Sequence, residues 1–534
     1  MDVLVDKPGL GQLPRPLPNS LPWRTRSIDH RRPDFEFAEF RLNSGELALL
    51  ATAILICLRC GLAATLPLSF DEAYYWLWSK HLAGGYFEHP AAIAFVIRAG
   101  TFAFGDTEFG VRFIPLVISV VASWAVWRTA TIILGGKTAG AIAVLLFNCT
   151  LMISAEGMAA TPDSPLVAAA ALLLWSVAEL ERTQNGRWWL AAGGAMGSAI
   201  AAKYTGFFLC GSVAIWLAIR AAAGPRAGTN WLRTLWPYAG AAIVLTMFAP
   251  TLYWNATHAF ISFRFQFGRV VAGHISVLHL LEFIGGQMAL ASPGVFALSG
   301  IGFYSSVRSP RSPSLSFVLA VVSLPLLYFI LHSLHDRVQA NWPCFVYPAL
   351  AVLAAKAFTD FPPEGAHPGP TRLICRSAIP LGCLILAVAY VQAFFGAIPL
   401  GHSDPISRMA GVGFQPVADR IAAEARKIGA HAIVTTNYPA TSWLRFYGRS
   451  TVPVIQIADD SRFLSSPTAT QDILEDNLLY VTQHERSELP LVLTHFSRVT
   501  HLAAFVRSRN GIPIDTFDTF AIGSIRGPVT GRIP

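Results

Sequence analysis

Two adjacent carboxylates follow the first long apolar segment of the chain. Asp71 and Glu72 stand beside several tyrosine and tryptophan residues, and Glu88 and His89 follow a short distance later. A carboxylate shielded from water has a raised pKa and can act as a general base, and a nearby cation can bind a phosphate leaving group. Aromatic residues of this kind are typical of the membrane–water interface. The stretch indicates chemistry on a polar group carried by a lipid, although an aromatic belt whose carboxylates only cap a helix fits it equally well.

Four further polar residues lie at the ends of later apolar segments. They are Asp163, Lys203, Tyr204 and Arg337. Three of them also fit ordinary structural roles, since Asp163 can cap a helix, Lys203 can extend to the interface and Arg337 can belong to a polar turn. One acid that removes a proton and two or three cations that bind a phosphate would complete a group-transfer site.

The composition is that of a membrane protein. Hydrophobic residues make up 53% of the 534 residues and charged residues 13%, whereas soluble globular proteins carry roughly 25% charged residues. The net charge of +8 does not indicate nucleic-acid binding, because the arginines lie in short loops between apolar segments and form no continuous patch. Positive residues at the cytoplasmic ends of membrane helices account for them.

About eleven apolar segments approach the roughly 20 residues that a membrane span requires. The predicted spans are 47–66, 112–134, 138–154, 163–180, 188–203, 205–222, 236–255, 280–303, 314–332, 342–358 and 374–398. Lysine and arginine residues concentrate in the N-terminal tail and on every second loop, which marks these as cytoplasmic. The Asp71 loop is therefore expected on the outer side, together with the region that follows the last of an odd number of spans.

Three regions follow from this pattern. Residues 1–45 are predicted to be a disordered cytoplasmic tail, and residues 46–400 a helical membrane domain whose first outer loop is 67–111. Residues 401–534 are predicted to be a small outer α/β domain. Its expected elements are a helix over 414–427 and strands over 432–436, 452–457, 477–482 and 519–523.

Several motifs, in this order along residues 45 to 450, together resemble the GT-C class of membrane glycosyltransferases. The motifs are Asp71-Glu72 after the first span, Tyr86-Phe87-Glu88-His89-Pro90, the Asp163 loop, Lys203-Tyr204 and Asn341-Trp342-Pro343. Within this class the chain is most similar to family-39-type bacterial enzymes, which include lipopolysaccharide galacturonosyltransferases and, more distantly, lipid A aminoarabinose transferase and the protein O-mannosyltransferases.

The resemblance implies a GT-C fold and an inverting transfer of a sugar from a polyprenyl-phosphate donor. The acceptor would be lipid A, lipopolysaccharide or another cell-envelope molecule at the periplasmic face of the bacterial inner membrane. The resemblance makes Asp71 the catalytic carboxylate that deprotonates the acceptor hydroxyl.

The expected substrate-binding residues follow from the same resemblance. Lys203 would lie near the donor phosphate, and His89 and Arg337 would be weaker phosphate or sugar contacts. The remaining residues expected to bind substrate are Glu72, Glu88, Asp163 and Tyr204. Relatives carry Glu-Lys-Pro where this chain has Glu88-His89-Pro90, which leaves open the cation that meets the donor there, and the identity of the sugar.

We expect no nucleotide, cofactor, metal or nucleic-acid partner. The chain has no Gly-rich phosphate loop, and the spacings of its histidines match no standard metal site. The seven cysteines all lie at or before Cys383, so the C-terminal region needs no disulfide framework.

The charged residues of the membrane part allow three classes of function to be compared. The isolated ones all map to the outer side, and ionisable groups at membrane depth are costly and usually functional. A transporter or flippase of a lipid-linked sugar would carry them near the midplane of the membrane. A scaffold that only displays the C-terminal domain would not need them on one face. Their placement favours the enzyme.

Overall fold

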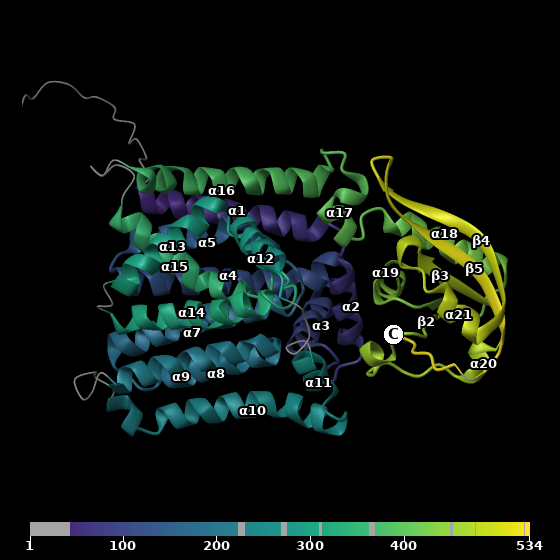
Figure 1. Cartoon of the computed structure of the whole chain (residues 1–534), viewed down its shortest axis with the longest axis horizontal. Helices are drawn as coiled ribbons and strands as arrows, with labels where there is room; N and C mark the ends of the chain where they lie inside the picture. The colour runs from purple at the N-terminus through teal and green to yellow at the C-terminus, as the bar shows by residue number, and fades with distance from the viewer. Residues whose placement is uncertain are drawn as a thin grey trace, which may run out of the picture. The chain divides into compact units, whose positions relative to one another are not determined.

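The computed structural model describes residues 43–222, 230–268, 275–308, 312–361, 369–448, 452–475, 477–527 and 529–534. The predicted N-terminal tail lies almost wholly outside these ranges. Residues Asn43–Pro534 form one compact unit. Within this unit a bundle of helices meets a smaller part built on a sheet, and α2 and α3 lie where the two meet (Figure 1).

The regular structure of the membrane part, over its described residues, is almost entirely helical. Its helices are α1 (Ser44–Thr65), α2 (Phe70–Lys80), α3 (Ala92–Phe104), α4 (Glu108–Leu134), α5 (Lys137–Asn148), α6 (Leu151–Glu156), α7 (Asp163–Thr183), α8 (Trp188–Ala202), α9 (Phe207–Ala222), α10 (Trp236–Thr257), α11 (Ile261–Gly268), α12 (Val277–Leu290), α13 (Pro293–Arg308), α14 (Pro313–Ser333), α15 (Tyr347–Asp360) and α16 (Pro370–Phe395).

Helices occupy each of the predicted spans. In the described part of the chain, six are long and apolar enough to cross a membrane alone, or seven if the bent pair α12 and α13 is one span. The predicted span over 280–303 consists of two helices, α12 and α13, which are bent by 104° at the break between them. Ser292 between them has a positive φ of 65°, and Pro293 cannot donate the backbone hydrogen bond that would continue α12.

The C-terminal part has more regular structure than the sequence predicts. It contains α17 (Pro405–Met409), α18 (Phe414–Lys427), β1 (Ala432–Thr435), α19 (Tyr438–Tyr447), β2 (Val454–Gln456), the short 3-10 helix η6 (Asp460–Phe463), α20 (Gln471–Leu474), β3 (Leu478–Gln483), α21 (Leu489–His495), β4 (Phe496–Arg509) and β5 (Ile512–Ile525). The strand order is β2-β1-β3-β5-β4, with β1 parallel to β2 and β3, and β5 antiparallel to β3 and β4.

One hydrophobic core joins the first outer loop to the C-terminal part. Side chains of α2 and α3 share this core with α18, α19 and one face of the sheet. Polar contacts reinforce it around Leu68, whose carbonyl accepts hydrogen bonds from the Trp443 indole and the Gly411 backbone and whose N–H donates to Tyr447 Oη. The C-terminal part is therefore fixed directly against the segment that carries Asp71.

Candidate active site

The helix α2 sets the direction of the two adjacent carboxylates. Ser69 caps α2, and Glu72 completes the capping box by accepting a hydrogen bond of 2.9 Å from the Ser69 backbone N–H. Asp71 is the second residue of the helix. Because neighbouring helical residues point about 100° apart, the capping role of Glu72 turns Asp71 to a different face of α2.

Asp71 faces the C-terminal part. The hydroxyl of Tyr438, at the start of α19, donates a 3.1 Å hydrogen bond to Asp71 Oδ1. Burial raises the pKa of Asp71 to about 6; the bond from Tyr438 opposes this rise, the negative charge of Glu88 adds to it, and the charge of Arg462 opposes it. Asp71 remains partly exposed. It is therefore reachable from outside and mostly ionised at neutral pH, as a general base must be.

A tight hairpin presents Glu88 and His89 beside α2. A β-bridge joins Gly85 to Pro90, and α11 supports the turn through Gln266, which donates a 2.7 Å hydrogen bond to the Glu88 carbonyl. Gly84 is required here, since a side chain at this position would meet the Pro250 carbonyl oxygen at 2.7 Å. The turn that the bridge between Gly85 and Pro90 closes thus brings Glu88 to the Asp71 site. The ring of His89 packs edge-on against Tyr75 with centroids 6.1 Å apart.

The partner of Glu88 comes from the far end of the sequence. Nη1 of Arg462, in η6, lies 2.6 Å from Glu88 Oε1. Its guanidinium also stacks over the Tyr438 ring at 4.4 Å, and the Tyr74 hydroxyl donates to the Arg462 carbonyl at 3.0 Å. Neither Arg462 nor Tyr438 is among the site residues expected from the sequence. The segment around Arg462 contains no recognisable motif. The sequence signal that could have pointed to it is Glu88, a carboxylate with no lysine or arginine close to it in the sequence, which suggests a cation from a distant segment.

The contacts of Glu72 are those of a residue that stabilises the fold. It is buried and forms two bonds with Arg112 of α4, at 2.6 and 2.7 Å, while accepting a 3.0 Å bond from the Ala160 N–H. Burial opposes ionisation, but the charge and hydrogen bonds of Arg112 outweigh it and lower the pKa of Glu72. Arg112 also donates to the carbonyl of Ala63, in the last turn of α1, and to that of Pro67, just after α1. Glu72 therefore anchors α2 to α1, α4 and the loop that leads to Asp163.

Asp163 and Lys203 form a second buried cluster. Lys203 Nζ lies 2.7 Å from Asp163 Oδ1, and Asn341 Nδ2 donates to Oδ2 at 2.8 Å. The Cys344 thiol also points at Asp163 Oδ1, at 3.1 Å. Both members of the ion pair are buried. The predicted motif residues are thus brought together, with the charge of Lys203 directed at Asp163.

Glu156 lies beside this cluster, close to the charges of Asp163 and Lys203. Burial, followed by the negative charge of Asp163, raises the pKa of Glu156 to about 8, while the bond from the Thr161 hydroxyl, at 2.7 Å, opposes the rise. The raised pKa favours the neutral form of Glu156, which avoids a second buried negative charge beside the Asp163–Lys203 pair.

Tyr204 and Arg337 lie in different surroundings. Tyr204 follows Lys203 directly in the sequence, but its hydroxyl contacts a different helix. It accepts a 3.2 Å hydrogen bond from Asn255 of α10. Arg337 is 74% exposed and pairs with Glu282 of α12 at 3.0 Å. The structure therefore gives Arg337 a partner that was not among the predicted site residues.

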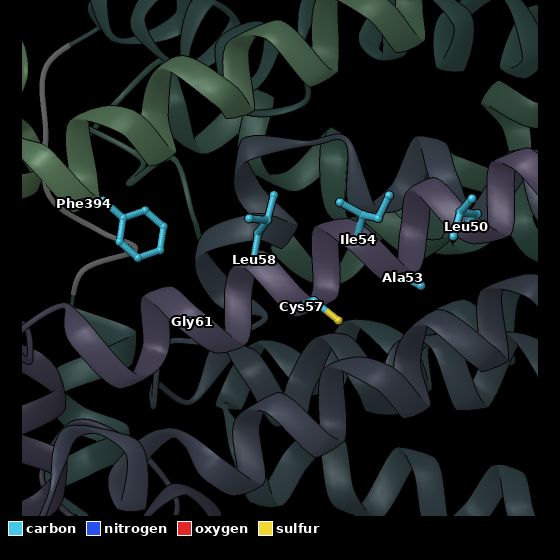
Figure 2. Close-up of a pocket in the computed structure, with 7 residues that line it drawn as sticks. All are labelled: Leu50, Ala53, Ile54, Cys57, Leu58, Gly61 and Phe394. Atoms are coloured by element: carbon cyan, nitrogen blue, oxygen red, sulfur yellow. The ribbon is translucent and has the colours of Figure 1, made fainter.

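The described residues include no group of three His, Cys, Asp or Glu side chains arranged to hold a metal ion. An apolar groove of about 460 Å³ lies along α1 and ends at Phe394 of α16 (Figure 2). Its lining residues carry no charge; they are Leu50, Ala53, Ile54, Cys57, Leu58, Gly61 and Phe394. The groove has no group for acid–base chemistry, so the Asp71 site remains the candidate active site.

Comparison with known sequences agrees with the predicted resemblance. Residues 88–254 match the family model of dolichyl-phosphate-mannose-protein mannosyltransferases. A lipid A galacturonosyltransferase of Rhizobium johnstonii, RgtD, is 28% identical over 296 residues. This match covers 53% of the present chain and 59% of the relative, so the chain matches about three fifths of that relative's length.

Solved structures agree on the fold over a longer part of the chain. ArnT from Cupriavidus metallidurans bound to undecaprenyl phosphate superposes with a TM-score of 0.63 at 17% identity, covering 89% of this chain and 98% of that one. The oligosaccharyltransferase of Archaeoglobus fulgidus gives a TM-score of 0.51 at 11% identity, covering 88% and 75%. The predicted GT-C membrane fold with a small C-terminal sheet domain is confirmed, as is the resemblance to membrane glycosyltransferases.

Proposed function

We propose that this chain, as a multi-pass membrane glycosyltransferase of GT-C fold, transfers a sugar from a polyprenyl-phosphate donor to a hydroxyl group of lipid A or another cell-envelope acceptor. The proposal rests on one observation above all. Asp71 is a partly exposed carboxylate whose pKa is raised to about 6, and it accepts a hydrogen bond from Tyr438 at the end of the helical bundle.

The proposed reaction needs one base. The acceptor oxygen attacks the anomeric carbon from the face opposite the phosphate, and its proton passes to Asp71. The bond between the anomeric carbon and the phosphate oxygen breaks, and its electron pair stays on the phosphate. The configuration at the anomeric carbon is inverted by this single displacement. Asp71 suits the step because a base works best when its pKa is close to the working pH.

The substrates are proposed from chemistry and from the relatives. RgtD is named for galacturonosyl transfer to lipid A, and the ArnT structure holds undecaprenyl phosphate. The loops rich in lysine and arginine lie on the side of the membrane opposite to the Asp71 loop, and such loops are usually cytoplasmic. We therefore propose that the Asp71 site opens to the periplasm of a bacterial inner membrane. Substrate contacts from Glu88, whose charge acts on Asp71, and from the neighbouring His89 are part of this proposal.

The proposal is tested by transfer with purified protein in detergent. Undecaprenyl-phosphate-linked hexuronic acid, pentose and hexose would be offered with lipid A or core oligosaccharide. Wild type is expected to transfer one sugar class, while Asp71→Asn is inactive and Asp419→Asn, at an exposed position of α18, behaves as wild type. Absence of transfer from every donor by folded wild type would contradict the proposal and favour a transporter of lipid-linked sugars.

A further inference from the structure

We propose that Arg462 binds the phosphate of the lipid donor, so that the C-terminal part supplies a substrate-binding residue and completes the active site. This inference rests on the proposed function and extends it to a residue that lies outside the helical bundle. It is carried by the position of Arg462, its exposure, and the charges around Asp71.

Arg462 is held at the same place by both its backbone and its side chain. Tyr74 of α2 bonds its carbonyl oxygen, Glu88 bonds its Nη1, and the Tyr438 ring lies under its guanidinium. Tyr438 also bonds Asp71, so a single side chain contacts both the candidate base and the candidate phosphate ligand. A group bound by Arg462 is therefore adjacent to the carboxylate that would remove the acceptor proton.

The other cations of the candidate site are engaged in buried pairs or lie elsewhere. The Arg112 side chain is 1% exposed against Glu72, and the Lys203 side chain is 9% exposed against Asp163. Arg337 is exposed but pairs with Glu282. Of these four cations, Arg462 alone combines partial exposure, 20% of its side chain, with a place beside Asp71.

The chemistry of transfer requires a cation at this point. While linked to the sugar, the donor phosphate is a diester with one negative charge, and release of the sugar leaves a monoester with additional charge on the departing oxygen. At the same moment Asp71 gains a proton and becomes neutral. A guanidinium can bond two phosphate oxygens at once, and such charge-assisted bonds are about twice as strong as neutral ones. Arg462 would therefore stabilise the charge where it develops.

Glu88 would hold Arg462 until the donor arrives. The ion pair is partly exposed, with the Glu88 side chain at 15% and the Arg462 side chain at 20%, so a ligand can approach the guanidinium. Only Nη1 of Arg462 meets Glu88, and a guanidinium carries five N–H donors, so donors remain for a phosphate. Glu88 keeps the guanidinium near Asp71 in the empty enzyme, which reduces the ordering cost of donor binding.

The end of the chain fixes the segment that carries Arg462. Arg532 Nε lies 2.5 Å from Asp460 Oδ1 in η6, and the Arg532 backbone forms β-bridges with Gln456 and Thr468. Arg532 is thus a positioning residue for Arg462. Its replacement is expected to weaken donor binding in the same direction as loss of Arg462 but to a smaller extent.

The experiment measures binding of undecaprenyl phosphate to the full-length protein, without any sugar transfer. Arg462→Gln is expected to weaken binding about tenfold to a hundredfold, as removal of hydrogen bonds between charged groups does. Arg462→Lys keeps the charge but not the bidentate geometry, and should bind with intermediate affinity. Arg532→Gln should show a smaller loss. The control is Arg426→Gln, at an exposed position of α18, which should bind as wild type.

The outcomes separate this inference from the proposed function. Equal binding by wild type and a folded Arg462→Gln variant overturns the inference, and the proposed function still stands if wild type transfers sugar and Asp71→Asn does not. Normal phosphate binding with a transfer defect confined to the hexuronic donor also overturns it, since Arg462 would then contact the sugar carboxylate. Absence of binding by wild type overturns the inference and the donor class together. Should Arg462→Gln fail to fold, equal binding by Arg462→Lys and wild type would overturn it.

Discussion

The hydroxyl of Tyr438 donates a hydrogen bond of 3.1 Å to Oδ1 of Asp71, although 367 residues separate the two in the sequence. The bond joins the start of α19 in the C-terminal part to the start of α2 in the first outer loop. A residue from outside the membrane helices therefore contacts the candidate base and influences its pKa. This contact connects the fold of the C-terminal part to the proposed chemistry.

The pH dependence of transfer should report Asp71. Burial raises its pKa to about 6, and only the deprotonated carboxylate can accept a proton. The value of kcat/KM should therefore rise with pH through about 6 and level off above it. The measurement is a pH profile with saturating acceptor and limiting donor. Full activity maintained down to pH 4 would contradict the assignment.

Tyr438→Phe should shift that profile to higher pH. The Tyr438 hydroxyl favours the charged form of Asp71, so its loss raises the pKa of the carboxyl further. Activity near pH 6 should fall by about tenfold, the typical effect of losing one hydrogen bond to a charged group. Tyr480→Phe is the matched control, because its buried hydroxyl contacts Thr436 within the sheet part. An unchanged profile for Tyr438→Phe would exclude its role in tuning Asp71.

Loss of Arg112 should reduce stability. Arg112→Ala would leave Glu72 buried and unpaired, which typically costs about 3–5 kcal/mol, whereas removing both charges is far better tolerated. Thermal unfolding in detergent should therefore rank wild type and the double variant Glu72→Gln/Arg112→Met above Arg112→Ala. Wild-type stability of Arg112→Ala combined with weaker donor binding would instead indicate that this pair contacts substrate.

Lys203→Met separates two roles for Lys203. The structure pairs Lys203 with Asp163 in a buried cluster, so its loss should lower the unfolding temperature, with a cost of about 3–5 kcal/mol for a broken buried pair. Lys427→Met, on the exposed face of α18, is the control. A raised KM for donor with unchanged stability would show that Lys203 serves the donor phosphate, as the family resemblance implies.

Local patterns predict the local structure well. The amphipathic spacing over 414–427 predicts α18 to both of its end residues, and the strands predicted over 432–436, 452–457 and 477–482 overlap β1, β2 and β3. These features depend on neighbours in the sequence. The strand β4 was missed because its pairing with β5 contains register shifts at His501/Ala503 and Arg507/Ser508, which interrupt the alternation of inward and outward side chains.

The candidate site is only partly predictable from the sequence. Asp71, Glu88 and Asp163 stand out because isolated charges are rare in an apolar chain. Their partners do not stand out, since Arg462 follows Tyr74 by 388 residues and lies in a polar segment where an arginine is ordinary. The different roles of Asp71 and Glu72 depend on the capping geometry of α2. The ion pair of Lys203 with Asp163 depends on the packing of three separate segments, which carry Asp163, Lys203 and Asn341.

The most direct test of the account is sugar transfer from undecaprenyl-phosphate donors by wild type and Asp71→Asn, measured side by side at pH 7.5. Burial raises the pKa of Asp71 from 3.8 to about 6, so ionisation of this carboxyl lowers the stability of the fold progressively as the pH rises from about 4 to about 6, and the full cost is present at pH 7.5. The neutral asparagine variant should therefore fold at least as well as wild type. The account predicts transfer by wild type and none by the folded variant. Transfer by Asp71→Asn at a rate near that of wild type would contradict it.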